Sequence, residues 1–189
     1  MIKKLLGLIL TLALCVACQS DKLYIKGKTQ GLNSGDTIVV SNDLKYGTPI
    51  DTIIVNNNQF RYQQTVDSVQ MAILYVKQNP EKNVIFFTEP GIIHILLSDI
   101  SFKSRVSGTP LNDDWQYYTD SIDSYSRRIN ALLEDSPIEK DKHHDAEFTQ
   151  KNVEHWYKAI ERCYNEVYER NVNNSLGKYL QNIDISKIK

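Results

Sequence analysis

The chain has 189 residues, of which 22 are basic and 23 acidic, so its formal net charge is −1. That length is enough for one domain with a substantial core, or for a small domain with an appendage. The basic residues neither form a block nor alternate with aromatic ones, so we expect no nucleic acid partner.

The first 17 residues have the pattern of a secretory signal peptide. Lys3 and Lys4 precede an apolar run over residues 5–14, and the small residue Ala17 closes the segment. The apolar run is too short for a membrane-spanning helix, which needs about 20 residues. A basic start, a short apolar run and a small residue before the cut together predict cleavage after residue 17.

Cys18 follows the predicted cut, and the segment therefore resembles the lipobox of bacterial lipoproteins. In those proteins the thiol of the first mature residue carries diacylglycerol. Cys15 departs from the pattern, which usually has leucine there, but a cut before Cys15 would follow the bulky Leu14. We predict a stable lipid anchor on Cys18, with residues 18–22 as its linker, and an ordinary secreted protein is the alternative. Gln19 is compatible with sorting to the outer membrane.

The sequence contains three cysteines, and Cys15 and Cys18 have the C-x-x-C spacing of a thioredoxin-type redox pair. Cleavage would remove Cys15, and lipid would occupy Cys18. Cys163 would then be the one remaining thiol. We therefore expect no dithiol oxidoreductase chemistry within the mature chain.

Residues 23–108 show the short alternating runs of a β domain, broken by turn residues. Asn56, Asn57 and Asn58 suit a tight hairpin, and Pro90-Gly91 suits a turn. The spacing of roughly ten residues, without a helical period, predicts an antiparallel β-sandwich or open barrel. Strands are expected over residues 23–28, 37–40, 51–55, 59–62, 69–76, 84–87, 92–97 and 101–106.

Five short motifs in this region resemble, in their order and spacing, a domain of unknown function common in lipoproteins of Bacteroides-type bacteria. That domain usually precedes a thioredoxin-like, TlpA-type disulfide reductase domain. The resemblance covers residues 23–112, with a weaker echo through Tyr179. The reductase motif would lie some tens of residues beyond Tyr179, so we expect no thioredoxin domain before Lys189. The motifs are Ile25-Lys26-Gly27, Gly35-Asp36-x-Ile38, Asp51-Thr52-Ile53-x-Val55-x-Asn57-x-x-Phe60, Glu89-Pro90-Gly91-x-Ile93-x-Ile95 and Gly108-Thr109-x-x-Asn112.

Residues 109–189 are predicted to form a helical hairpin and connector after the β domain, giving an α+β chain. A first helix is expected over residues 111–133, begun by Thr109-Pro110, and a second over residues 146–170. Each carries apolar residues at spacings of three and four. These stripes contain Leu111, Trp115, Tyr118, Ile122, Tyr125, Ile129 and Leu132 in the first helix, and Val153, Trp156, Ile160, Cys163 and Val167 in the second.

Two interpretations of these stripes remain open. The helices can pack on each other and on the β domain, or part of the seam can form an interface with a partner or a second copy. The residues of this possible interaction seam are Trp115, Tyr118, Ile122, Trp156 and Ile160.

The polar residues predict no catalytic site, no metal and no cofactor. His143-His144-Asp145, with Glu147 nearby, is the most ligand-like group, but adjacent histidines in a polar loop point in different directions. His94 and His155 fit ordinary strand and helix positions, and Cys163 fits a buried apolar position. No G-x-S-x-G elbow and no glycine-rich phosphate loop occurs.

The sequence thus predicts a lipid-anchored protein of the bacterial cell envelope, in the outer membrane, that acts as a non-enzymatic binding or accessory module with a possible envelope protein partner. One alternative is a truncated or split thiol-disulfide oxidoreductase that lacks its catalytic domain. Another is an assembly module that works through the helical hairpin.

Overall fold

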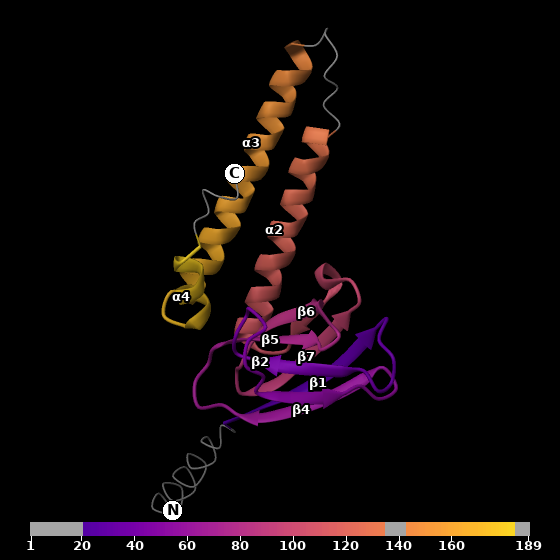
Figure 1. The fold of residues 1–189 in the computed structure, drawn as a ribbon. Coiled ribbons are helices and arrows are strands. Elements are labelled where there is room, and N and C mark those ends of the chain that lie inside the picture. The colour runs from indigo at the N-terminus through magenta and orange to yellow at the C-terminus, as the bar shows by residue number, and fades with distance from the viewer. Residues whose placement is uncertain (1–20, 135–142, 184–189) are drawn as a thin grey trace, which may run out of the picture.

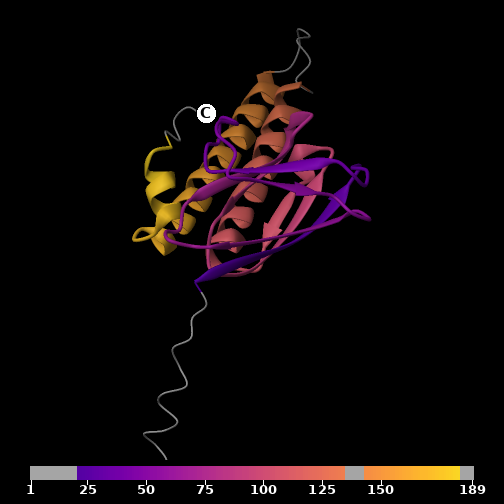
Figure 2. The same ribbon diagram turned by 60° about the horizontal axis from the view of Figure 1, so that its bottom comes forward.

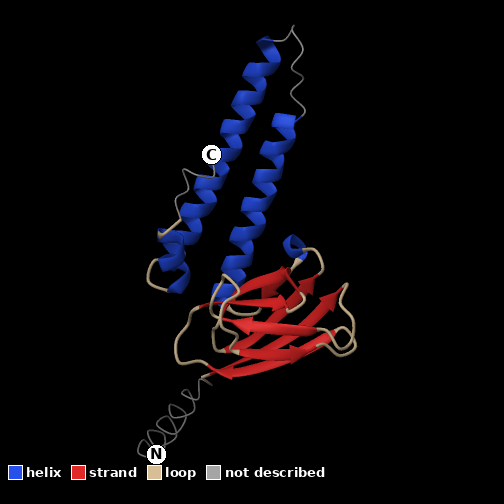
Figure 3. Ribbon diagram, in the orientation of Figure 1, coloured by secondary structure: helices blue, strands red, loops and turns tan. Residues whose placement is uncertain are grey.

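The computed structural model of the chain describes residues 21–134 and 143–183. A β-rich part comes first and helices follow it, as predicted for an α+β chain (Figure 1, Figure 3). The strands are β1 (Lys22–Gln30), β2 (Thr37–Ser41), β3 (Asp51–Ile54), β4 (Gln59–Thr65), β5 (Met71–Val76), β6 (Asn79–Phe87), β7 (Gly91–Ser98) and β8 (Arg105–Ser107), and the helices are α2 (Pro110–Glu134), α3 (His143–Asn171) and α4 (Ser175–Gln181).

The strands form two four-stranded sheets, ordered β4-β1-β7-β8 and β3-β2-β5-β6, which enclose one core. The predicted sandwich is therefore confirmed. Its neighbouring strands are antiparallel except β1 and β7, which run parallel. The strand expected over residues 101–106 is shorter, because Ser101–Lys103 forms a 3-10 turn (η2) closed by a hydrogen bond from Lys103 N to Ile100 O of 2.9 Å.

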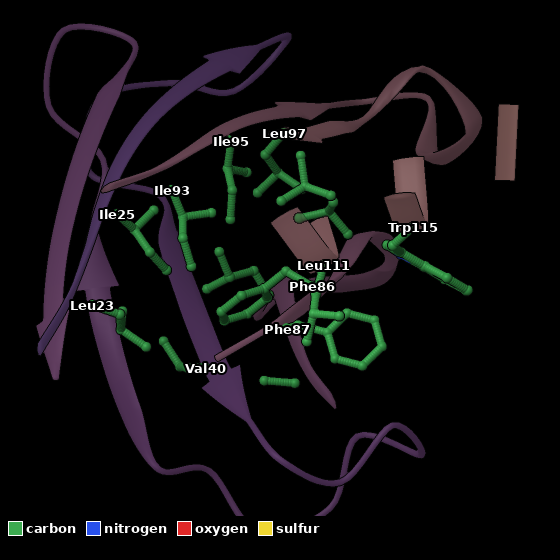
Figure 4. Close-up of a cluster of buried hydrophobic side chains, with 14 of the residues drawn as sticks. Leu23, Ile25, Val40, Phe86, Phe87, Ile93, Ile95, Leu97, Leu111 and Trp115 are labelled. Carbon is green, nitrogen blue, oxygen red and sulfur yellow. The ribbon is translucent and has the colours of Figure 1, made fainter. Parts of the chain in front are cut away.

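The core lies between the sheets and follows from the alternation along each strand (Figure 4). In β1, Leu23 and Ile25 are buried while the residues between them are exposed. Burying one such side chain contributes about 1.5–3 kcal/mol. Gly27 faces the same side, directly opposite Phe60 of β4, and a Cβ there would overlap the Phe60 ring. The aromatic ring therefore requires glycine at this point of β1.

The outer face of the β3-β2-β5-β6 sheet is apolar and is covered by the chain's own loop. Val39, Ile73 and Tyr75 form a second buried cluster on this face, and Leu44 packs against it. Tyr46, from the same loop, places its ring 5.1 Å from that of Tyr75 in an edge-to-face arrangement. The central strands β2 and β5 are thus buried on both sides, whereas Ile54 of the edge strand β3 is exposed.

Helix α2 closes the edge of the sandwich where β6 and β8 lie. Its first turns bring Leu111 and Trp115 into the main core. The Trp115 indole N–H donates to Ile85 O at 3.1 Å, and its ring lies edge-on to Phe87 at 6.2 Å between centroids. The helix is therefore fixed to β6 by both polar and apolar contacts.

Asn112, fully buried at the start of α2, makes the closest polar connection between the helix and the sandwich. Its Oδ1 accepts from Phe87 N at 2.7 Å, and its Nδ2 donates to Phe87 O at 2.9 Å and to Thr109 Oγ1 at 2.7 Å. One side chain thus satisfies both backbone groups of a residue at the end of β6. Nearby, Glu89 Oε2 accepts from Leu111 N at 2.8 Å.

Helices α2 and α3 form the predicted hairpin, and α4 folds back against α3. The bounds of α2 agree with the prediction, whereas α3 begins at His143, three residues before the expected Ala146. Leu176 and Leu180 of α4 are fully buried, and Tyr164 Oη donates to Leu180 O at 3.1 Å. Ser175 Oγ donates to Val69 O at 2.6 Å, so α4 also contacts the β-rich part.

The Asn112 contacts predict a loss of stability in Asn112→Ala, because Phe87 N would lose its partner inside the core, whereas Phe87 O keeps the hydrogen bond that it accepts from Glu89 N at 2.8 Å. We expect the free energy of unfolding to fall by about 2 kcal/mol, since a buried unpaired group costs about 1–3 kcal/mol. Urea denaturation followed by circular dichroism measures this. Asn130→Ala, at an exposed position of the same helix, is the matched control, and equal stability of the two variants would contradict the role given to Asn112.

Candidate functional site

Cys18, the predicted lipidation site, lies outside the described residues. The first strand begins at Lys22, only four residues later in the sequence. No helix within the described ranges combines the length and apolar character needed to cross a membrane. A predicted anchor on Cys18 would therefore be joined to β1 by a very short stretch of chain.

The buried part of the predicted interaction seam packs within the chain. Trp115, Tyr118 and Ile160 are all less than a tenth exposed. Trp115 stacks with Tyr118 at 6.0 Å and meets Tyr179 of α4 edge-on at 5.5 Å. Trp115 and Tyr118 thus belong to the main core, and Ile160 is buried within α3.

The other two seam residues, Ile122 and Trp156, are half-buried. Trp156 stacks with Tyr125 at 5.7 Å between centroids, and the Arg128 guanidinium lies 4.7 Å from the Trp156 ring centroid. His155 meets the same ring edge-on at 4.9 Å. The distal part of the hairpin is therefore held by aromatic and cation–π contacts between α2 and α3. Its use by a partner stays a prediction.

Cys163 is a buried thiol between the helices, at 3% exposure. Burial raises the pKa of this thiol, and nearby Glu166 raises it further. A hydrogen bond with Ser121 and the charge of Arg170 act in the opposite direction. Because the thiolate is the reactive form, a thiol in this environment is a poor nucleophile.

The histidines do not form a ligand cluster in the described part of the chain. The side chains of His143, His144 and Asp145 lie outside it. His155 is exposed beside Trp156, and His94 is exposed on β7. Among the described side chains, no group of three or more His, Cys, Asp or Glu residues is placed to hold a metal ion.

The outer face of the β4-β1-β7-β8 sheet brings together basic residues that are far apart in sequence. Lys26 of β1 lies between Arg61 of β4 and His94 of β7 in the strand register. Lys28 lies in the next outward row, in register with Gln59 and Leu96, and Leu96 is in turn opposite Arg105 of β8. We call this surface the basic sheet face, and its members are Lys22, Lys26, Lys28, Arg61, His94 and Arg105.

The basic sheet face carries little compensating negative charge. Strands β1, β4, β7 and β8 contain no acidic residue. Arg105 forms an ion pair with Asp120 of α2 at 3.4 Å, but Lys26, Lys28 and Arg61 form none with any residue that the structure describes. A shallow hollow lies over this face, lined by the outward side chains of Lys26, Lys28 and Arg61 together with His94. The arrangement is suited to holding an anionic surface or group.

Sequence inspection missed this face because no basic block marks it. Lys26, Arg61 and His94 are separated by more than thirty residues at each step. The alternation of β1 predicts that Lys26 and Lys28 share one side of the strand. Which strands flank β1, and in which register, cannot be obtained from that alternation.

Comparison with known proteins matches residues 23–115 to a family model described as a domain of unknown function, DUF4369. The match runs from the first buried residue of β1 to Trp115 in α2. It therefore includes Asn112 as well as all eight strands. No curated protein matches the chain.

Tyr118 gives a test of the packing between the helices. Burial raises its pKa to about 12, from 10.0. The folded state then keeps the phenol proton at pH values where the unfolded state loses it, so this stabilisation is complete below pH 10 and is lost as the pH rises towards 12. We expect the parent protein to lose about 2–3 kcal/mol over this interval on account of Tyr118.

Urea denaturation at a series of pH values compares the parent protein with Tyr118→Phe. The variant should lose less stability above pH 10, because its residue 118 has no phenol to ionise. Parallel curves for the two proteins up to pH 12 would show that Tyr118 is not buried between the helices as described.

Proposed function

Residues 23–115 match the DUF4369 family model, whose description names no reaction. We propose that the chain is a lipid-anchored protein of the bacterial cell envelope, in the outer membrane. It acts there as a non-enzymatic binding or accessory module. The observation that carries the proposal is the leader: a basic start, a short apolar run and Ala17 directly before Cys18.

Only a few residues separate Cys18 from β1, so a lipid on Cys18 would hold the β domain close to the membrane and not at the end of a long linker. Two or three acyl chains hold a protein stably on a membrane, whereas a single chain does so only marginally. A domain that begins at Lys22 would be held close to the lipid surface from its first strand. Gln19, next to the anchor, supports sorting to the outer membrane.

Several features support binding over catalysis. The one thiol in the described residues is buried with a raised pKa, and the histidines His94 and His155 lie apart on different elements. The basic sheet face is instead an open surface that offers several cationic side chains at once. A resemblance to the leading domain of thioredoxin-like lipoproteins supports an accessory role beside other envelope proteins.

The lipid anchor predicts a clear result in cells grown with labelled palmitate. The parent protein should carry the label and sediment with the outer membrane, since the acyl chains sit on Cys18. Cys18→Ala should lose the label and leave the outer membrane fraction. Fluorography of the purified protein and density-gradient separation of the two membranes measure this.

Two matched cysteine variants complete that experiment. Cys15→Ala and Cys163→Ala each remove one thiol but leave Cys18 in place, so both should keep the label. An unlabelled parent protein, or equal labelling of Cys18→Ala, would overturn the proposed anchor. If Cys15→Ala lost the label and Cys18→Ala kept it, the lipid would be on Cys15, which would also overturn the proposed anchor on Cys18.

A further inference from the structure

We propose that the basic sheet face lies against the anionic lipid headgroups of the membrane that holds the Cys18 anchor. This inference rests on the proposed anchoring of Cys18 and adds to it an orientation: the β4-β1-β7-β8 sheet faces the membrane and the helical hairpin faces away. Three observations on the described residues lead to it.

The first is the length of chain between the anchor and the sheet. Lys22 is the fourth residue after Cys18, and a fully extended chain spans at most about 3.6 Å per residue. Lys22 therefore lies no more than about 14 Å from the acylated cysteine. Lys26 and Lys28 follow on the same side of β1, about 13 Å and 20 Å further along the strand at about 3.3 Å per residue. The basic sheet face therefore begins within about 14 Å of the anchored residue.

The second is charge. Basic residues near an anionic membrane are attracted to it within a Debye length, about 8–10 Å at physiological ionic strength. Lys26, Lys28 and Arg61 point to the same side of one sheet, and no acidic residue interrupts the four strands. Asp21, exposed just before β1, is the nearest acidic residue in sequence. The charge of this cationic sheet face is therefore complementary to that of an anionic membrane surface.

The third observation is that two large apolar side chains are exposed on the sheet between the anchor and Lys26. Tyr24 and Ile92 are register partners there, and they are 38% and 43% exposed. Tyrosine, with an apolar ring and a polar hydroxyl, is enriched at the boundary between membrane and water. An exposed Tyr–Ile pair next to basic side chains suits the headgroup region.

The other surfaces fit an anionic membrane less well. The centre of the outer face of the β3-β2-β5-β6 sheet is already covered by the loop that carries Leu44 and Tyr46. Helix α2 carries acidic residues at Asp113, Asp114, Asp120, Asp123 and Glu134 against two arginines. Figure 2 shows the strands in front of the helices when the end of the molecule opposite the hairpin comes forward. The hairpin can therefore extend away from the lipid surface while the sheet lies on it.

Lysine labelling of the acylated full-length protein tests the orientation. The detergent-purified protein is added to preformed vesicles, either of phosphatidylcholine alone or of equal parts phosphatidylcholine and phosphatidylglycerol, and the bound fraction is collected by flotation. A membrane-impermeant acetylating reagent is then applied, and mass spectrometry measures the rate at each lysine. Lys28 is the reporter because it lies furthest from the anchor, and the exposed Lys77 and Lys151 are internal controls.

We expect Lys28 to be labelled at least about fivefold more slowly on the anionic vesicles than on those of phosphatidylcholine alone. A factor of about five corresponds to the attraction of one basic residue to an anionic membrane surface. Lys77 and Lys151 should react equally on both kinds of vesicle. Salt at about 1 M, which shortens the Debye length to about 3 Å, should restore the rate at Lys28. In K26Q/R61Q the slowing at Lys28 should be largely lost, whereas K77Q/K151Q, with the same change in net charge, should keep it.

The outcomes separate this inference from the anchor. A protein that floats with both kinds of vesicle but shows equal labelling of Lys28 on each would overturn the orientation and leave the anchor intact. Protection of Lys77 or Lys151 in place of Lys28 would show that another surface faces the lipid. A protein that fails to float with either vesicle would overturn the anchor and, with it, the orientation.

Discussion

The attachment of α2 to the end of β6 through Asn112 is the contact on which the arrangement of the two halves depends. The amide satisfies both backbone groups of Phe87 inside the core, where an unpaired group costs about 1–3 kcal/mol. Trp115 then packs one turn further along the same helix. Because α3 packs on α2 and α4 packs on α3, the position of the whole helical part follows from this first turn. The bond from Ser175 to Val69 adds a second attachment.

The residues that carry the family resemblance have structural tasks in this fold. Gly27 leaves room for the ring of Phe60 across the β1–β4 pair. Glu89 accepts from the backbone of Leu111, and Asn112 binds Phe87. In the part of the chain that the structure describes, these motif positions therefore account for how the sandwich is built and closed by a helix.

Local periodicity was enough to predict most of the elements, because a strand or helix with one buried face repeats that burial along its own sequence. The pairing of strands was not predictable in the same way. The alternation of β1 is equally compatible with a parallel or an antiparallel neighbour, so the β1–β7 pair could not be foreseen. For the same reason Lys26, Arg61 and His94 could not be placed side by side. The spacing of its apolar residues predicts that α2 carries an apolar stripe, but which of these residues contact the sandwich depends on where Asn112 attaches the helix.

The formal net charge of −1 was a poor guide to which partners the surface can attract. It is a sum over regions of opposite character: the β4-β1-β7-β8 strands contain basic residues and no acidic ones, whereas α2 has an acidic excess. Attraction at close range depends on the local field within a Debye length, and not on the total. A nearly neutral chain can therefore still present a cationic face. If Cys18 holds the protein on a membrane, Lys22 is the charged residue of the sheet nearest to the anchor in sequence. The separation of basic strands from the acidic α2 would then favour one orientation of the protein, with the sheet towards the anionic headgroups.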